Sequence, residues 1–228
     1  MKERILILLL FCAAVSQAGT VEKSYRFGQY TIRSGGGFQT VSFPGTRLMG
    51  IPGEPLLAWQ EVVFLLPPGE AAQSIEITGE DETVIPGHFT IRPGQHVRPL
   101  SAGDSGGFVQ NLQVYGKNEI YGSGRHARLQ TQYLDGYAFA LSAFCPVRYN
   151  PGTGNLSWYK KVTVRVVTGP SGRSREALEQ LSSPGKTTEI VRSFARNPEM
   201  ISLYPILKLI LKMPILKIIK KFPLRLLP

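Results

Sequence analysis

The sequence has little of the chemistry from which many enzymes build their active sites. Of its 228 residues only two are cysteine and three are histidine. Cys12 lies in an apolar run near the N-terminus, so Cys145 is the only cysteine in the rest of the chain, which excludes an intrachain disulfide and a site built from cysteine pairs. His88, His96 and His126 are scattered without the spacing of a metal site. We therefore expect no metal and no cofactor.

Two motifs hint at catalysis, but their contexts argue against it. Cys145 follows the apolar run "YAFALSAF", which favours a buried structural thiol over a nucleophile. "GDSGG" at residues 103–107 matches the nucleophile motif of chymotrypsin-like serine proteases, yet neither His88 nor His96 upstream has the context of a catalytic histidine. A glycine-rich loop is the better interpretation. The sequence predicts no catalytic residue and no enzyme.

The N-terminus has the pattern of a secretory signal peptide. Lys2 and Arg4 precede an apolar run over residues 5–15, and small residues follow at positions 16 and 18. This run is too short to span a membrane as a helix. We expect cleavage between Ala18 and Gly19 and a secreted protein, extracellular or periplasmic.

Basic charge is concentrated at the other end. The chain carries a net charge of +10, and residues 200–228 hold six lysines and arginines with no acid. The rest has no basic face interleaved with aromatic residues, which argues against a nucleic-acid partner. Pro205, Pro214 and Pro223 interrupt any continuous amphipathic helix in this tail. Its composition is typical of a segment that contacts a membrane surface or a partner, and also of translation out of the ancestral frame.

The middle of the chain has the regularly spaced turn residues of an all-β domain. Over residues 19–168, short runs of β-forming residues alternate with Gly/Pro turns at about ten-residue spacing, which predicts an antiparallel β-sandwich or jelly roll. In the last run alternate residues are apolar, and we expect this strand, residues 156–167, to form a hairpin with a strand over 136–148. Residues 169–199 are more polar and predict a linker with short helices, the start of a flexible or helical C-terminal extension.

Several segments together resemble a known family. "CPVRYNPGTGNLSWYKKVTVRV" at residues 145–166 is similar to the closing hairpin of the propeptide of gingipain-type cysteine peptidases (clan CD, family C25). "GIPGEPLLAWQEVVFLLPPGE", "FTIRPGQHVRP" and "YLDGYAFALSAFCPV" come before it in the expected order, so the resemblance covers about residues 22–168. Ala58 and the missing Tyr-Pro pair near residues 122–124 depart from the family pattern. No catalytic His and Cys pair follows the domain, so we expect the product of a truncated or split gene.

The resemblance implies a non-catalytic prodomain that inhibits a cysteine endopeptidase and assists its folding. The expected partner is the catalytic domain of the peptidase, encoded downstream in the DNA. In "GSGRHARLQ", Arg125 and Arg128 are the candidates for an inhibitory loop that enters an acidic specificity pocket, although an ordinary solvated loop fits the same residues. Arg173, Arg175 and Arg196 are candidate sites of activation cleavage.

A second function fits the same architecture. β-Sandwiches also serve as glycan- or surface-binding modules. Trp59, Tyr115, Tyr121 and Trp158 would supply the aromatic platform of such a module, although Trp158 lies on the apolar side of its strand, which favours core packing.

Overall fold

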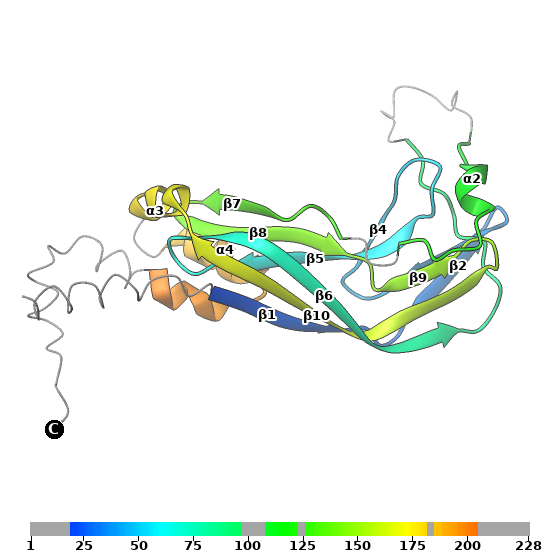
Figure 1. Cartoon of the computed structure of the whole chain (residues 1–228), viewed down its shortest axis with the longest axis horizontal. Coiled ribbons are helices and arrows are strands. Elements are labelled where there is room, and N and C mark those ends of the chain that lie inside the picture. Colours follow the sequence, from blue (N-terminus) through cyan, green and yellow to red (C-terminus); the bar gives the residue numbers. More distant parts are fainter. Residues whose placement is uncertain (1–18, 97–107, 123–125, 182–184, 205–228) are drawn as a thin grey trace, which may run out of the picture.

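The structure is a computed structural model that describes residues 19–96, 108–122, 126–181 and 185–204. The predicted signal peptide, Arg125, the "GDSGG" segment and residues 205–228 of the tail lie outside these ranges. The described chain is an elongated, mostly antiparallel β-structure with its C-terminal helices gathered at one end (Figure 1). The predicted all-β class is confirmed.

The first sheet is built around one long strand. β10 (Asn155–Pro170) lies between β1 (Gly19–Arg26) and β6 (Glu70–Ile85), and all three run antiparallel to their neighbours. β9 (Val147–Asn150) also pairs with β10, beyond the point where β1 ends. Figure 1 shows β6 and β10 crossing the length of the molecule side by side.

The second sheet has the order β4-β5-β8-β7. Its strands are β4 (Arg47–Met49), β5 (Leu57–Leu65), β8 (Tyr137–Phe144) and β7 (Gln130–Leu134). β2 (Thr31–Gly35) and β3 (Phe38–Ser42) form a separate two-stranded ribbon.

The main core lies where the apolar faces of these sheets meet. Val162, Val164 and Val166 on β10 are at most 1% exposed, as their period-two spacing predicts. They belong to one cluster with Phe64 of β5 and Phe144 of β8. Complete burial of each such side chain contributes roughly 1.5–3 kcal/mol, so this cluster holds the two sheets together.

The predicted hairpin between residues 136–148 and 156–167 is wrong in its first strand. β8 ends at Phe144 and belongs to the second sheet, where it pairs with β5 and β7. Only β9 forms the hairpin, in which Val147 pairs with Trp158. Pro146 explains the break, because it lacks the N–H that a continuing ladder needs. The chain changes sheets at this proline.

The segment expected to be a linker with short helices contains α3 (Gly172–Glu179), α4 (Lys186–Phe194) and the 3₁₀ helix η2 (Pro198–Ser202). These elements pack on the second sheet around a smaller core, whose buried members include Leu65, Phe139, Leu178, Val191 and Tyr204. A single turn, α2 (Leu112–Tyr115), precedes them in the chain and is capped by the Asn111 side chain. Within the described ranges no helix is long and apolar enough to cross a membrane.

Candidate functional site

Hydrogen bonds hold both ends of the loop that contains Arg125. On one side, the Tyr121 N–H donates to the Tyr149 carbonyl of β9 at 2.7 Å. On the other side, the Ala127 N–H donates to the Ala143 carbonyl of β8, also at 2.7 Å. The loop therefore leaves one sheet and returns to the other. Arg125 itself lies outside the described residues.

Arg128, the second predicted inhibitory residue, is exposed on the returning side of this loop. Its segment runs beside β8 and leads into β7. The Ser142 hydroxyl donates to the Ala127 carbonyl at 2.7 Å, which fixes the backbone just before Arg128. The exposed side chain of Arg128 thus projects from a backbone segment that is fixed against β8.

An apolar cavity of about 640 Å³ opens beside the two loop ends. Its lining residues include Leu48, Met49, Ile51, Trp59, Tyr121 and His126. Three of them are exposed although apolar: Leu48 at 38%, Met49 at 40% and Ile51 at 58%. They come from β4 and the residues just after it, at the edge of the second sheet. Sequence reasoning missed this surface because its residues are scattered along the chain.

A short hydrogen bond fixes one wall of this cavity. The Tyr121 hydroxyl donates to a carboxylate oxygen of Glu54 at 2.6 Å. Hydrogen bonds to an ionised acceptor are stronger than neutral ones. The bond therefore ties the start of the loop to the turn before β5.

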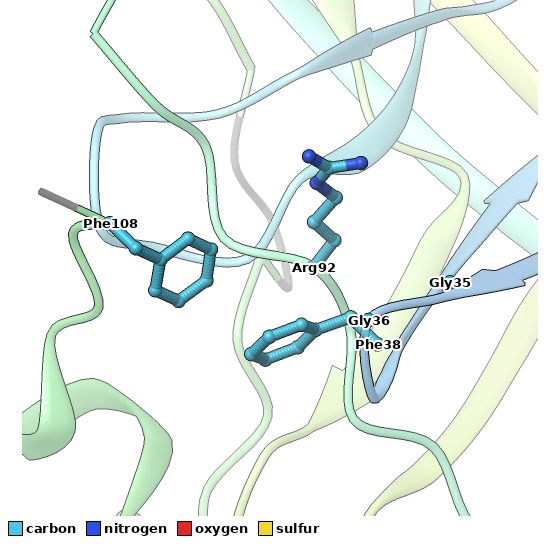
Figure 2. Close-up of a pocket in the computed structure, with 5 residues that line it drawn as sticks. All are labelled: Gly35, Gly36, Phe38, Arg92 and Phe108. Carbon is cyan, nitrogen blue, oxygen red and sulfur yellow. The ribbon is translucent and has the colours of Figure 1, made fainter. Parts of the chain in front are cut away.

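A second recess of about 430 Å³ lies at the tip of the β2–β3 ribbon. Figure 2 shows the rings of Phe38 and Phe108 on one side of the turn at Gly35 and Gly36, with the guanidinium of Arg92 pointing away from both rings. The two ring centres are 5.3 Å apart and their planes are tilted by 34°. This recess is smaller than the cavity beside the loop.

Cys145 has the environment of a packing residue. Its side chain packs against the main core, and its thiol donates to the Val147 carbonyl at 3.3 Å. Burial raises the pKa of the Cys145 thiol to about 12. A thiol that stays protonated at neutral pH is a poor nucleophile. This agrees with the interpretation of Cys145 as structural.

The histidines occupy surface positions. His88, His96 and His126 are all exposed. Among the residues that the structure describes, no three His, Cys, Asp or Glu side chains lie close enough to hold a metal ion. The expectation that the protein uses no metal stays a prediction.

The candidate cleavage sites have different settings. Arg173 and Arg175 are exposed on α3, and the Arg173 guanidinium lies 5.2 Å from the centre of the Tyr133 ring. Arg196 follows α4, and its side chain is exposed. Its backbone N–H, however, donates to the Val63 carbonyl of β5 at 2.9 Å.

The four aromatic residues considered for a glycan platform do not share one surface role. Trp158 is only 6% exposed, and its indole N–H donates to the Phe27 carbonyl at 3.2 Å. The Tyr115 hydroxyl donates to the Ile91 carbonyl at 2.6 Å. Trp59 and Tyr121 line the cavity beside the loop instead. Trp158 is therefore a core residue.

The chain is thus an all-β domain with an apolar cavity at its surface, beside a loop whose two ends are hydrogen-bonded to the sheets. Comparison with known families identifies the family of this domain. The model of the Propeptide_C25 family matches residues 21–188, so the chain belongs to this family of gingipain-type propeptides. Membership gives it the role of a prodomain.

Solved structures show the same fold. One describes the zymogenic latency of gingipain K from Porphyromonas gingivalis; it is 21% identical with a TM-score of 0.53 and covers 67% of this chain and 88% of that chain. Another is the complex of the Porphyromonas gingivalis RgpB pro- and mature domains, 18% identical with a TM-score of 0.56, covering 82% of this chain and 96% of that chain. No curated protein matches the sequence.

Proposed function

We propose that the protein is a secreted prodomain that inhibits a gingipain-type cysteine endopeptidase and assists its folding. The observation that carries this proposal is the family match over residues 21–188. The structure of RgpB pro- and mature domains in complex supports it, since a protein of the same fold binds a peptidase domain there. Secretion rests on the predicted signal peptide over residues 1–18.

Inhibition would use the loop between Tyr121 and His126. An arginine side chain forms charge-assisted, often bidentate, hydrogen bonds with a carboxylate, and it keeps its charge at any physiological pH. Arg125 belongs to this loop and Arg128 follows it by a few residues, and the loop ends are fixed on both sheets. Fixed ends lower the entropy that the loop loses on binding.

The apolar cavity beside the loop would form part of the same contact face. The exposed Leu48, Met49 and Ile51 lie on its rim, and apolar area at the centre of an interface contributes much of its stability. The same surface would assist folding of the peptidase. The prodomain has two hydrophobic cores of its own, so it presents an ordered surface on which the peptidase chain can fold.

The test is inhibition of a gingipain-type mature domain by the full chain, with RgpB as the probe. We expect the double variant Arg125→Ala/Arg128→Ala to inhibit at least about 30-fold more weakly. It removes the positive charges that would pair with the acidic specificity pocket of the peptidase. The matched control is Arg33→Ala/Arg192→Ala, which removes two exposed arginines elsewhere on the surface. Equal inhibition by both double variants would show that the loop arginines do not enter the pocket.

A further inference from the structure

The segment that follows α4 lies against the edge of the second sheet. Residues 196–204, which we call the C-terminal strap, contain η2 and run beside β5. β4 pairs with β5 only from Leu57 to Trp59. Further along the same edge, the polar backbone groups of β5 need other partners, because an open strand edge presents unpaired N–H and C=O groups. The strap supplies these partners.

Asn197 substitutes for a neighbouring strand. Its side-chain amide donates to the Leu65 carbonyl at 2.7 Å, and its side-chain oxygen accepts from the Leu65 N–H at 2.8 Å. The residue is only 3% exposed. Both bonds are therefore shielded from water. In this buried position, a donor or acceptor left without a partner would cost stability.

Tyr204 fixes the far end of the strap. Its hydroxyl donates to the Leu66 carbonyl at 2.8 Å and accepts from the Ala138 N–H at 3.0 Å. The residue is fully buried, with its ring centre 4.7 Å from that of Tyr137. Between the two fixed ends, Ile201 packs into the smaller core.

The strap also reaches the first sheet. Glu199 pairs with Lys23 of β1 at 3.8 Å, and Met200 packs against both core clusters. The exposed ion pair contributes little on its own. The position matters more, because the strap crosses the side of the sandwich where β1 is an edge strand and where β5 no longer pairs with β4.

This arrangement bears directly on the Arg196–Asn197 peptide bond. A protease of trypsin-like specificity must draw several residues on each side of the scissile bond into its cleft in an extended form. The Arg196 side chain is exposed and available. The backbone is not available, because the Arg196 N–H is bonded to Val63 and Asn197 is buried against Leu65.

We propose that the strap keeps the Arg196–Asn197 bond closed to proteases until residues 196–204 detach from β5. The inference rests on the proposed prodomain function and on the prediction that Arg196 is an activation cleavage site, and it adds how cleavage there is regulated. Where opening and closing are fast, the cleavage rate follows the population of the open form. Detachment of the strap, and not exposure of the arginine, then controls cleavage at Arg196.

Arg173 provides an internal reference. It lies in the first turn of α3, outside the strap, where the Ser174 N–H bonds to the Ser171 side chain, so cleavage there needs only this one turn to open. Cleavage after Arg173 does not require the strap to move. The ratio of cleavage after Arg196 to cleavage after Arg173 therefore reports strap opening within a single molecule.

The experiment is limited proteolysis of the full chain by trypsin, with fragments identified by mass spectrometry. The cleavage ratio in urea-unfolded protein gives the intrinsic preference for each bond. We expect the ratio in the folded protein to be at least about tenfold lower than in the unfolded protein. Tyr204→Phe removes the hydroxyl but leaves the scissile bond unchanged, and it should raise the folded-state ratio about tenfold.

Tyr149→Phe is the matched control. The Tyr149 hydroxyl is also buried and also bonds two backbone groups, the Phe89 carbonyl and the Ile91 N–H, but it lies outside the strap. We expect Tyr149→Phe to leave the ratio unchanged. A folded-state ratio equal to the unfolded one, or equal increases in both tyrosine variants, would overturn the proposal. Trypsin needs no cognate peptidase, so failure here is distinct from failure to inhibit RgpB.

Discussion

Two tyrosines of the main core show how much depends on a single hydroxyl. The Tyr149 hydroxyl has two backbone partners. The Tyr25 hydroxyl is buried with no hydrogen-bond partner in the described chain. Burial also raises the pKa of Tyr25 to about 12, and the Arg196 charge acts against this rise. The two residues therefore differ in what their hydroxyls contribute to folding.

This difference gives a prediction at the residue scale. Tyr149→Phe should lower the free energy of unfolding by about 1–3 kcal/mol, because it leaves the buried Ile91 N–H without a partner. Tyr25→Phe should change it by less than about 0.5 kcal/mol, since no bond is lost. Urea denaturation measures both. Equal losses in the two variants would contradict this account of the core.

Cys145 gives the second prediction, which concerns pH. Its pKa is raised from 9.0 to about 12 in the folded state, so the neutral thiol is favoured there. An unfolded chain loses this proton at lower pH than the folded chain. The contribution to stability is complete below pH 9 and is lost as the pH rises towards 12. Cys145→Ala should thus show a shallower loss of stability over this range.

The measurement is thermal denaturation of both proteins between pH 8 and about 11. A thiol-reactive dye provides the check, since it should label Cys145 slowly in folded protein and rapidly after unfolding. Rapid labelling of the folded protein at neutral pH would show that the thiol is accessible and ionised, contrary to its packing against the main core.

At the scale of elements, the β7–β8 turn depends on one glycine. Gly136 has φ +90°, and a Cβ there would lie 2.5 Å from the Leu181 Cα. Gly37, in the β2–β3 turn, has φ +81° with open space around it. Alanine at either position pays about 1–2 kcal/mol for the left-handed backbone.

We therefore expect Gly136→Ala to destabilise the protein by at least about 1 kcal/mol more than Gly37→Ala, since it adds a backbone clash to the same strain. Chemical denaturation of the two variants measures this difference. If both lost the same stability, the close approach of Leu181 to this turn would be wrong.

Elements with a strong local pattern could be predicted from the sequence. The alternation of Val162, Val164 and Val166 predicted the buried face of β10. The polar composition after residue 170 predicted the short helices there. Partner choice could not be predicted in the same way. Residues 136–148 looked like one strand, but Pro146 divides them between two sheets. Pairing between distant strands leaves no local signal.

The site was only partly predictable for the same reason. The loop arginines stand out in "GSGRHARLQ". The cavity beside them draws on β4, β5 and both loop ends, which only the fold brings together. The strap was missed because Asn197 and Tyr204 act through buried hydrogen bonds to backbone groups more than 60 residues away in sequence.

The cavity allows a prediction at the scale of the whole molecule. Ile51→Glu should weaken inhibition of RgpB by about 10-fold or more if the cavity rim faces the peptidase, since a charge would be buried there without a partner. The control is Val84→Glu, which alters an apolar residue that is 68% exposed on β6. Equal inhibition by both variants would place the contact face elsewhere.

The central claim is that the whole chain is a prodomain of a gingipain-type peptidase, and direct titration tests it best. Increasing amounts of the full chain are added to the RgpB mature domain while peptidase activity and complex formation by size exclusion are followed. We predict saturable loss of activity together with a one-to-one complex. Full activity and no complex at about 100 μM chain, well above the Kd of a specific interface of standard size, would contradict this claim.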